Sequence, residues 1–213
     1  SAAALDTTAA GDLWDNTLIN TTATQTLTAA QGRTAPMASQ SGDNLMVYSL
    51  PTLVDGLALA GSYQAANTTG SGSTAIGGTY TGVEGLSVSY GQGSSDDVLG
   101  LIGDQTVMKA SYAYGSFTIG ASNSDYDHTT ATIDQEVSSF SLAYTVSDSI
   151  SVSYGEETID RGVLAQDIEV TGISASYTSG GMTATFAQVE AENVDHVLNT
   201  DKEVWKIGLS FAF

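Results

Sequence analysis

The feature that most constrains this chain is a strict two-residue alternation of side-chain character, clearest in residues 203–213. One set of alternate positions is large and apolar: Trp205, Ile207, Leu209, Phe211 and Phe213. The intervening positions are small or charged: Lys206, Gly208, Ser210 and Ala212. Successive side chains of a β-strand point to opposite faces, so this period predicts a strand with one apolar face. Its length and its aromatic residues at both ends are typical of a transmembrane strand of ~9–11 residues.

The same alternation recurs from residue 44 onward. It predicts eleven strands, at 44–50, 57–65, 73–82, 86–94, 105–115, 116–124, 136–147, 149–159, 168–179, 181–191 and 203–213. In most of them one face is large and apolar, whereas the other is mostly Ser, Thr, Ala and Gly. Such small residues suit a wet interior better than a packed core. We therefore expect an all-β protein, a transmembrane antiparallel up-and-down β-barrel whose apolar faces meet lipid.

Composition narrows the classes of function. The chain has 24 Asp and Glu against 5 Lys and Arg, a net charge of −19, which excludes nucleic-acid binding through phosphate neutralisation as a main role. Charged residues are 14% of the chain, about half the share that is usual in soluble domains. No run of ~18 apolar residues is present, so the sequence offers no transmembrane helix.

The predicted connections alternate between short turns and longer loops. Gly115 and Ser147–Asp148 form tight turns, whereas Asp125–Gln135 and Glu192–Lys202 form long loops. Short turns at one end and long loops at the other are typical of outer-membrane barrels. Most of the acidic residues fall in the predicted long loops.

Carboxylates in one predicted loop are weak candidates for a metal site. Asp125, Asp127 and Asp134 offer the hard oxygen ligands that Ca²⁺ and Mg²⁺ prefer, although their spacing does not match an EF-hand loop. Apart from a Ca²⁺ or Mg²⁺ ion at acidic loops, the sequence indicates no cofactor. Bridging of such ions to anionic lipopolysaccharide is a more modest hypothesis.

Residues 1–43 lack the alternation and are rich in Ala and Thr. Within them, Asp12–Ile19 is predicted to form a short helical turn, with Leu13, Trp14, Leu18 and Ile19 on its apolar side. We interpret 1–43 as a long loop with local helix. Irregular segments of this length are uncommon in compact proteins and are often functional.

Eleven is an unexpected strand count, because single-chain bacterial barrels usually have an even number of strands. The last strand ends on the short-turn side, and residues 1–43 enter the first strand from the long-loop side. An odd number of further strands is therefore expected.

Three features resemble the general porins of Gram-negative bacteria, the trimeric 16-stranded type. These are the strand that ends in Phe213, the run NLMVYSLPTLVDG of Asn44–Gly56 followed by LALAGSY, and the acidic, partly helical segment before that run. The resemblance implies that 1–43 is the third loop, which folds into the barrel and constricts it. It also implies that 44–213 supplies strands six to sixteen. The first five strands are absent, so we expect a fragment, a nicked product, or one chain of a two-chain barrel.

The resemblance implies a homotrimer in the outer membrane of a Gram-negative bacterium, in contact with membrane lipid and lipopolysaccharide. Its function would be a water-filled pore for passive diffusion of small hydrophilic solutes and ions, and the acid excess predicts a weak cation preference. A pore of this kind is set by charged side chains at a constriction. The candidates are Asp6, Asp12, Asp15 and Arg33 in the inward loop and Lys109 and Lys206 on the wall. No catalytic motif such as GxSxG or HExxH is present, so we expect no enzyme.

Aromatic residues on the apolar faces are candidates for the girdle at the membrane interfaces, where a ring meets both apolar and wet surroundings. The girdle candidates are Tyr63, Tyr90, Tyr112, Tyr144, Tyr154, Trp205, Phe211 and Phe213.

Two alternatives remain at this point. One is a complete 12-stranded barrel, similar to autotransporter translocators, in which 1–43 supplies one strand and a plug. The other is a soluble acidic β-sandwich, as in a surface adhesin.

Overall fold

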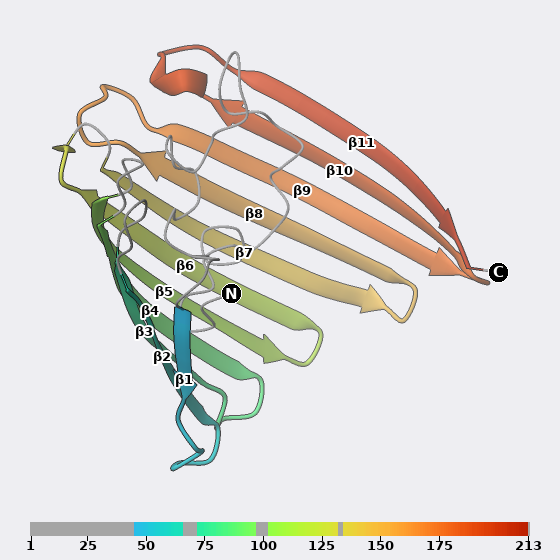
Figure 1. The fold of residues 1–213 in the computed structure, drawn as a ribbon. Coiled ribbons are helices and arrows are strands. Elements are labelled where there is room, and N and C mark those ends of the chain that lie inside the picture. Colours follow the sequence, from blue (N-terminus) through green and yellow to red (C-terminus); the bar gives the residue numbers. More distant parts are fainter. Residues whose placement is uncertain (1–44, 66–71, 97–101, 132–133, 213) are drawn as a thin grey trace.

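The computed structural model describes residues 45–65, 72–96, 102–131 and 134–212. These residues form one eleven-stranded antiparallel sheet whose strands lie side by side in sequence order (Figure 1). The strands are β1 Leu45–Ser49, β2 Leu57–Gln64, β3 Ser73–Tyr80, β4 Leu86–Asp96, β5 Ile102–Tyr114, β6 Phe117–His128, β7 Gln135–Ser147, β8 Ile150–Asp160, β9 Ile168–Ser179, β10 Met182–Glu192 and β11 Lys202–Phe211. A short 3₁₀ turn, η2 (Val194–His196), lies between β10 and β11. No helix among these residues is long and apolar enough to cross a membrane.

The connections at the two ends of the sheet differ, as the sequence predicted. At one end, which we call the short-turn end, two residues suffice between β5 and β6, β7 and β8, and β9 and β10. Gly180 and Gly181 make the last of these turns with φ of +56° and +81°. Tight hairpin turns of type I′ require positive φ at both central residues, which glycine adopts without a steric penalty. Longer connections lie at the opposite end, which we call the loop end (Figure 1).

Several strands extend further toward the loop end than their side chains predicted. β5 and β6 remain paired through Asp104 with Asp127 and Gly103 with His128. The prediction that Asp125 and Asp127 lie in a loop is therefore wrong, whereas Asp134 does lie in the β6–β7 connection. Acidic residues have low strand propensity, but the ladder is made by backbone groups and tolerates them at positions that face outward.

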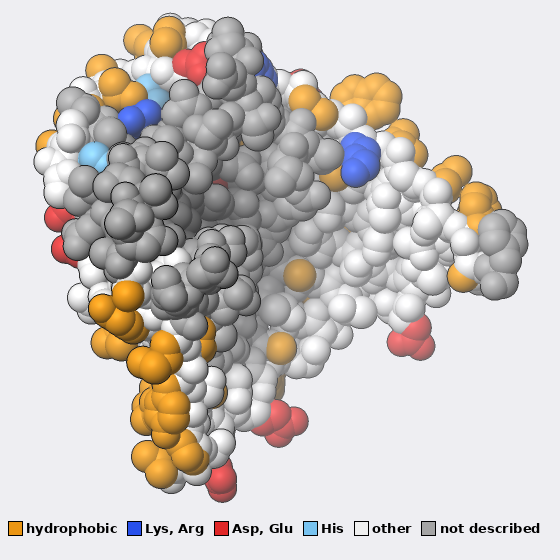
Figure 2. Space-filling view, in the orientation of Figure 1, with side chains coloured by type: hydrophobic (Ala, Val, Ile, Leu, Met, Phe, Trp, Pro, Cys, Tyr) orange, Lys and Arg blue, Asp and Glu red, His pale blue; other side chains and the backbone are white. Residues whose placement is uncertain are grey.

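The two faces of the sheet differ as the alternation predicted. The outer face carries the large apolar residues, and Leu209 and Phe211 on it are 62% and 57% exposed. The inner face is the concave one, and in Figure 2 its uncovered wall is mostly free of hydrophobic side chains. No second layer packs on the outer face among the described elements. The soluble β-sandwich hypothesis is therefore wrong, because its apolar face would be buried in a core.

The sheet is open between its two edge strands, β1 and β11. Both strands run from the loop end to the short-turn end, since each follows the chain toward that end of the sheet. They are parallel to each other and cannot complete an antiparallel ladder by pairing directly.

Candidate pore wall and membrane face

In the short-turn half of the sheet, the inner face is lined by hydroxyl groups that pair across neighbouring strands. Ser151 and Ser153 of β8 lie 2.7 Å, oxygen to oxygen, from Ser176 and Ser174 of β9. Similar pairs join Thr79 to Ser89 (3.0 Å) and Thr178 to Thr183 (3.0 Å). Each hydroxyl keeps further donor or acceptor capacity after one such bond, so the surface is small, polar and suited to contact with water.

Toward the loop end, the character of the two faces inverts on β7 to β10. On β9 the inner face changes from Ser174 and Ser176 to the buried Ile168 and Val170, while the outer face changes from Ile173 and Tyr177 to Glu169. The expectation that the inner face is mostly small and polar is therefore correct for the short-turn half, and on β7 to β10 it fails in the loop half. The loop half of the inner face carries a buried cluster, which we call the inner apolar patch: Val137, Ile159, Ile168, Val170, Val189 and Ala191.

Few charged residues occupy inner-face positions in the described strands. They are Lys109, Lys202, Lys206 and Glu157, as the register of each strand places them. The sequence placed Lys109 and Lys206 on this face, and the structure does the same. Lys206 is exposed and Lys109 is half-buried. Their role in a constriction stays a prediction.

Glu157 was missed at the sequence level. It follows Glu156 in a stretch that the sequence treats partly as loop, but strict alternation from Ser151 and Ser153 turns it inward, where it is 2% exposed. It lies in register with Lys109 through Ser122 and Ser139, whose hydroxyl oxygens are 2.7 Å apart. Three strand spacings separate the two charges, about 14 Å along the wall. The inward position of Glu157 can be found in the sequence by continuing the two-residue alternation from Ser151 and Ser153.

Described residues in the loop half of the inner face are mostly buried, whereas those in the short-turn half are more exposed. Gln105, Tyr126 and Gln135 on β5 to β7 are 1%, 4% and 6% exposed. Ser210 and Thr185 toward the other end, and Lys206 at the middle of β11, are exposed. The Tyr126 hydroxyl and the Gln135 amide nitrogen are buried without a hydrogen-bond partner among the described atoms. Buried polar groups of this kind are expected to find partners. Among the described residues, the inner face is therefore least exposed in the loop half.

The outer face presents an apolar belt with exposed aromatic residues. Among the girdle candidates Tyr63, Tyr90, Tyr112, Tyr154, Trp205 and Phe211 are exposed on this face, and Tyr144 is half-buried against Phe117 with ring centroids 4.4 Å apart. Phe213 lies outside the described residues. These positions suit rings that anchor at a membrane interface, which stays a prediction for each of them.

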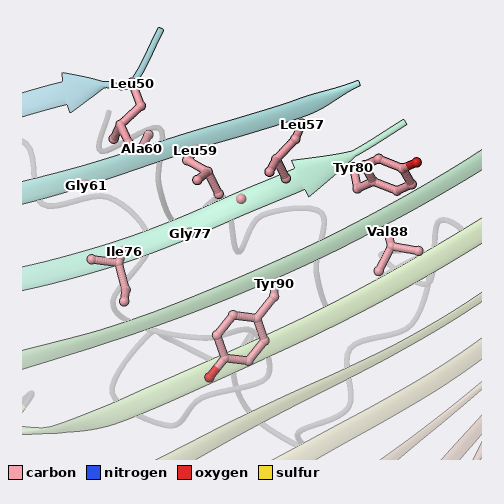
Figure 3. A pocket seen from close by; sticks show the side chains of 11 residues that line it. Leu50, Leu57, Leu59, Ala60, Gly61, Ile76, Gly77, Tyr80, Val88 and Tyr90 are labelled. Atoms are coloured by element: carbon pink, nitrogen blue, oxygen red, sulfur yellow. The ribbon is translucent and has the colours of Figure 1, made fainter. Parts of the chain in front are cut away.

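An apolar groove of about 500 Å³ lies on the outer face of β2 to β4. In Figure 3 the side chains of Leu59, Ile76 and Tyr90 project from neighbouring strands around it. Gly78 forms part of its floor, because a Cβ atom there would come within 2.5 Å of the Leu59 side chain. The groove faces away from the inner wall, so we regard it as part of the membrane face.

This wall has an apolar outer belt, a small polar inner face and alternating short and long connections. A model of the Gram-negative porin family matches residues 2–197. The chain belongs to the Gram-negative porin family. Membership confirms the resemblance found in the sequence and indicates the outer membrane of a Gram-negative bacterium as the location. It also favours a channel over an enzyme.

Solved porin structures share the fold. A porin refined at 1.8 Å resolution has a TM-score of 0.60 and 18% identity, with 79% of this chain and 60% of that chain covered. A multiple mutant of the Rh. blastica porin has a TM-score of 0.55 and 17% identity, with 80% of this chain and 56% of that chain covered. Pseudomonas aeruginosa OccK8 (OprE) has a TM-score of 0.55 and 12% identity, with 78% of this chain and 62% of that chain covered. This porin chain thus spans less than two thirds of each of these neighbours. Comparison with curated protein sequences gives no significant match.

The remaining site residues predicted for this porin are not placed by the structure. Asp6, Asp12, Asp15 and Arg33 lie outside the described residues, as does the whole segment 1–43 that was interpreted as the constriction loop. The domain division at residue 43 and the constriction roles stay predictions.

Acidic residues form a band on the outer face at the loop end, next to the apolar belt. We call this the outer acidic band, and it consists of Asp104, Asp125, Asp127, Glu136, Glu156, Asp160, Glu169, Glu190, Glu192 and Glu203. Several members lie directly opposite one another across strands, such as Glu136 with Asp160 and Glu190 with Glu203. Like charges in these positions repel. Within the described parts of the chain, no three His, Cys, Asp or Glu side chains are grouped to hold a metal ion.

Proposed function

We propose that this porin forms a water-filled pore for passive diffusion of small hydrophilic solutes and ions. The observation that carries the proposal is the inner wall of paired Ser and Thr hydroxyls behind an exposed apolar belt. Such a wall offers water and solutes weak hydrogen bonds along the passage, while the belt is solvated by lipid. No covalent step is needed.

Closure of this pore needs more strands than the sheet contains. Because β1 and β11 are parallel, an odd number of additional strands must lie between them in a closed antiparallel barrel. The resemblance to 16-stranded porins corresponds to five strands. The comparisons give no support for a separate chain or fragment as their source. By the same resemblance we propose a homotrimer.

We propose a weak cation preference for the pore. The net charge of −19 supports it, as do Asp6, Asp12 and Asp15 in the segment expected to constrict the passage. The described inner wall opposes it, since it has three Lys and one Glu in inner-face positions. Most strand carboxylates face outward, away from the passage, and dissolved counterions screen them. The preference is therefore expected to be small.

Single-channel recording in planar bilayers tests the proposal. In a KCl gradient we expect stepwise conductance and a reversal potential of the cation-selective sign. A reversal potential of the anion-selective sign would contradict the cation preference alone. Absence of conductance steps from correctly folded protein in the bilayer would contradict the pore itself.

We further propose that Ca²⁺ or Mg²⁺ links the outer acidic band to lipopolysaccharide phosphates. The band supports this because its repelling carboxylates sit where the apolar belt ends, at the level of anionic head groups. Substitution of Glu136 and Glu190 by Gln is expected to weaken the Mg²⁺-dependent retention of lipopolysaccharide on the purified porin. The measurement is the lipid retained with Mg²⁺ and with EDTA. The control is Glu84→Gln in a connection at the short-turn end, and an equal loss there would contradict the proposal.

A further inference from the structure

The outer-face groove on β2 to β4 is formed where large and small side chains face each other across neighbouring strands. Gly61 lies directly opposite Ile76. Gly78 lies between Leu59 of β2 and Tyr90 of β4. The large side chains form the walls of the groove, as Figure 3 shows, and none of its lining residues is charged. The groove therefore fits an apolar chain, and it is continuous with the apolar belt that faces lipid.

The groove has a tyrosine hydroxyl at each end. At the short-turn end the Tyr80 ring lies against Gly82, and its hydroxyl points away from Ile76 (Figure 3). At the other end the Tyr90 hydroxyl donates to Gln92 Oε1 at 3.1 Å. From Tyr80 to Ile76 the groove follows β3 for ~13 Å. The apolar band of an outer-membrane barrel is ~25 Å tall, so a chain in this groove belongs to one leaflet, the one at the short-turn end.

Two copies of one turn lie at the short-turn end of the groove. Residues 54–57 and 83–86 have the sequences VDGL and VEGL, and in each the leucine amide donates to the valine carbonyl oxygen at 3.0 Å. The glycine of each copy has a positive φ, +77° and +76°, which glycine adopts without a steric penalty. A 2.7 Å hydrogen bond from the Thr81 amide to the Gly56 carbonyl oxygen joins the two connections. The acidic residue of each turn is therefore held beside the groove.

The charged side chains of these two turns have one sign. Asp55 and Glu84 are exposed, and the connections 50–56 and 81–85 contain no Lys or Arg. Acidic side chains are visible at the short-turn end of the sheet in Figure 2. Two carboxylates attract a cationic group and repel an anionic one. This end of the groove therefore favours a phospholipid whose head group carries an ammonium over an anionic phospholipid.

We propose that the groove binds one acyl chain of a phospholipid with a primary ammonium head group, in the leaflet at the short-turn end. The acyl chain lies over Gly61 and Gly78, and the ammonium lies near Asp55 and Glu84. The Tyr80 hydroxyl donates to an ester or phosphate oxygen of the same lipid. The site is separate from the outer acidic band, which lies at the loop end. The proposal goes beyond the pore, because it concerns the outer face alone.

Native mass spectrometry of the porin tests the site. Porin purified in a mild detergent is mixed with phosphatidylethanolamine, and we expect a single molecule to be retained per chain. A Cβ atom at Gly61 would lie 3.6 Å from the Ala75 carbonyl oxygen and 3.8 Å from Ile76 Cγ2, which are ordinary contact distances. Gly61→Leu therefore fills the groove without disturbing the sheet and should reduce the retention several-fold. The matched control, Ala184→Leu, adds the same side chain opposite Leu209 on the outer face and should leave the retention unchanged.

Head-group variants keep the test valid if the filled groove prevents folding. The double variant Asp55→Asn and Glu84→Gln leaves every strand unaltered. The unaltered porin should retain phosphatidylethanolamine several-fold better than phosphatidylglycerol, and the double variant should lose this preference. Asp148→Asn, in the β7–β8 turn at the same end of the sheet, is the control and should keep the preference.

Several results would overturn the proposal. Equal retention by Gly61→Leu and the unaltered porin, or equal losses in Gly61→Leu and Ala184→Leu, would show that the groove is not the site. A preference for phosphatidylglycerol would contradict the ammonium head group. Preferential retention of lipopolysaccharide would place the occupant in the other leaflet. A change in subunit number with Gly61→Leu, at unchanged lipid retention, would make the groove a contact between copies of the chain.

Discussion

Replacement of Leu142 by Arg is expected to lower the free energy of unfolding from a lipid bilayer by about 2–4 kcal/mol, the range for a cation near the bilayer midplane. Leu142 lies in the centre of the apolar belt on β7, between Phe140 and Tyr144, and it is 37% exposed on the outer face. The guanidinium remains charged and must be moved out of water into hydrocarbon. Guanidinium titration of the porin folded in phospholipid vesicles measures the change.

The next residue along β7 provides the control. Ala143 occupies the opposite face, between Thr118 and Ser153 of the neighbouring strands, where the proposed passage would hold water. Ala143→Arg is expected to change the unfolding free energy by no more than ~0.5 kcal/mol, as surface substitutions usually do. If Ala143→Arg costs more than Leu142→Arg, the assignment of the two faces is reversed.

The double substitution of Lys109 and Lys206 by Glu is expected to raise the cation-to-anion permeability ratio about five-fold. Both residues are on the inner face. Each Lys→Glu change alters the wall by two charge units, four in total, and the two sites lie six strands apart on β5 and β11. A permeant ion that passes ~8 Å from one of these sites therefore feels a change of two units, worth about 1 kcal/mol in water, which corresponds to that factor. Reversal potentials in a KCl gradient give the ratio. Because salt screens the wall charges, the effect should be larger at low ionic strength.

Two variants show whether the inner position is what matters. Lys206→Arg keeps the charge and should leave the reversal potential unchanged. Glu203→Lys changes the charge by two units on the outer face of the same strand, three residues away, and should also have little effect. A shift with Glu203→Lys that is opposite in sign to that of the double substitution and about half as large would mean that total charge, rather than the charge of the wall, sets the selectivity.

The strands and their faces were predictable because a two-residue period is written directly into each segment. Trp205, Ile207 and Leu209 define the outer face of β11 without reference to any other strand. The strand ends were less predictable. Asp125 and Asp127 have low strand propensity, and their place in β6 depends on pairing with β5 and β7, which the sequence does not display.

The inverted pattern at the loop end explains the other differences. The run Ile168–Glu169–Val170 keeps the two-residue alternation, but its apolar residues face inward. Further along the same strand, the apolar residues Ile173 and Tyr177 face outward. The predicted strands already include these positions, but the sequence alone does not show that the two faces exchange their polarity along one strand. Glu157 was hidden for the same reason. The role of Asp12 and Asp15 was accessible only through resemblance to a family, since alternation says nothing about a segment that lacks it.

The wall formed by the described strands is a single sheet, so a substitution at one position affects only the inner or only the outer surface of the protein. A soluble domain hides its interior side chains among many neighbours, so a new side chain there disturbs folding and activity together. Here, positions such as Ser153, Ser174 and Thr185 face the proposed passage, whereas the residues next to them in the sequence are on the outer face, which we expect to contact the membrane. In the short-turn half, substitutions at the alternate positions that face inward can therefore change permeation. The positions between them, which face outward, continue to hold the protein in the lipid.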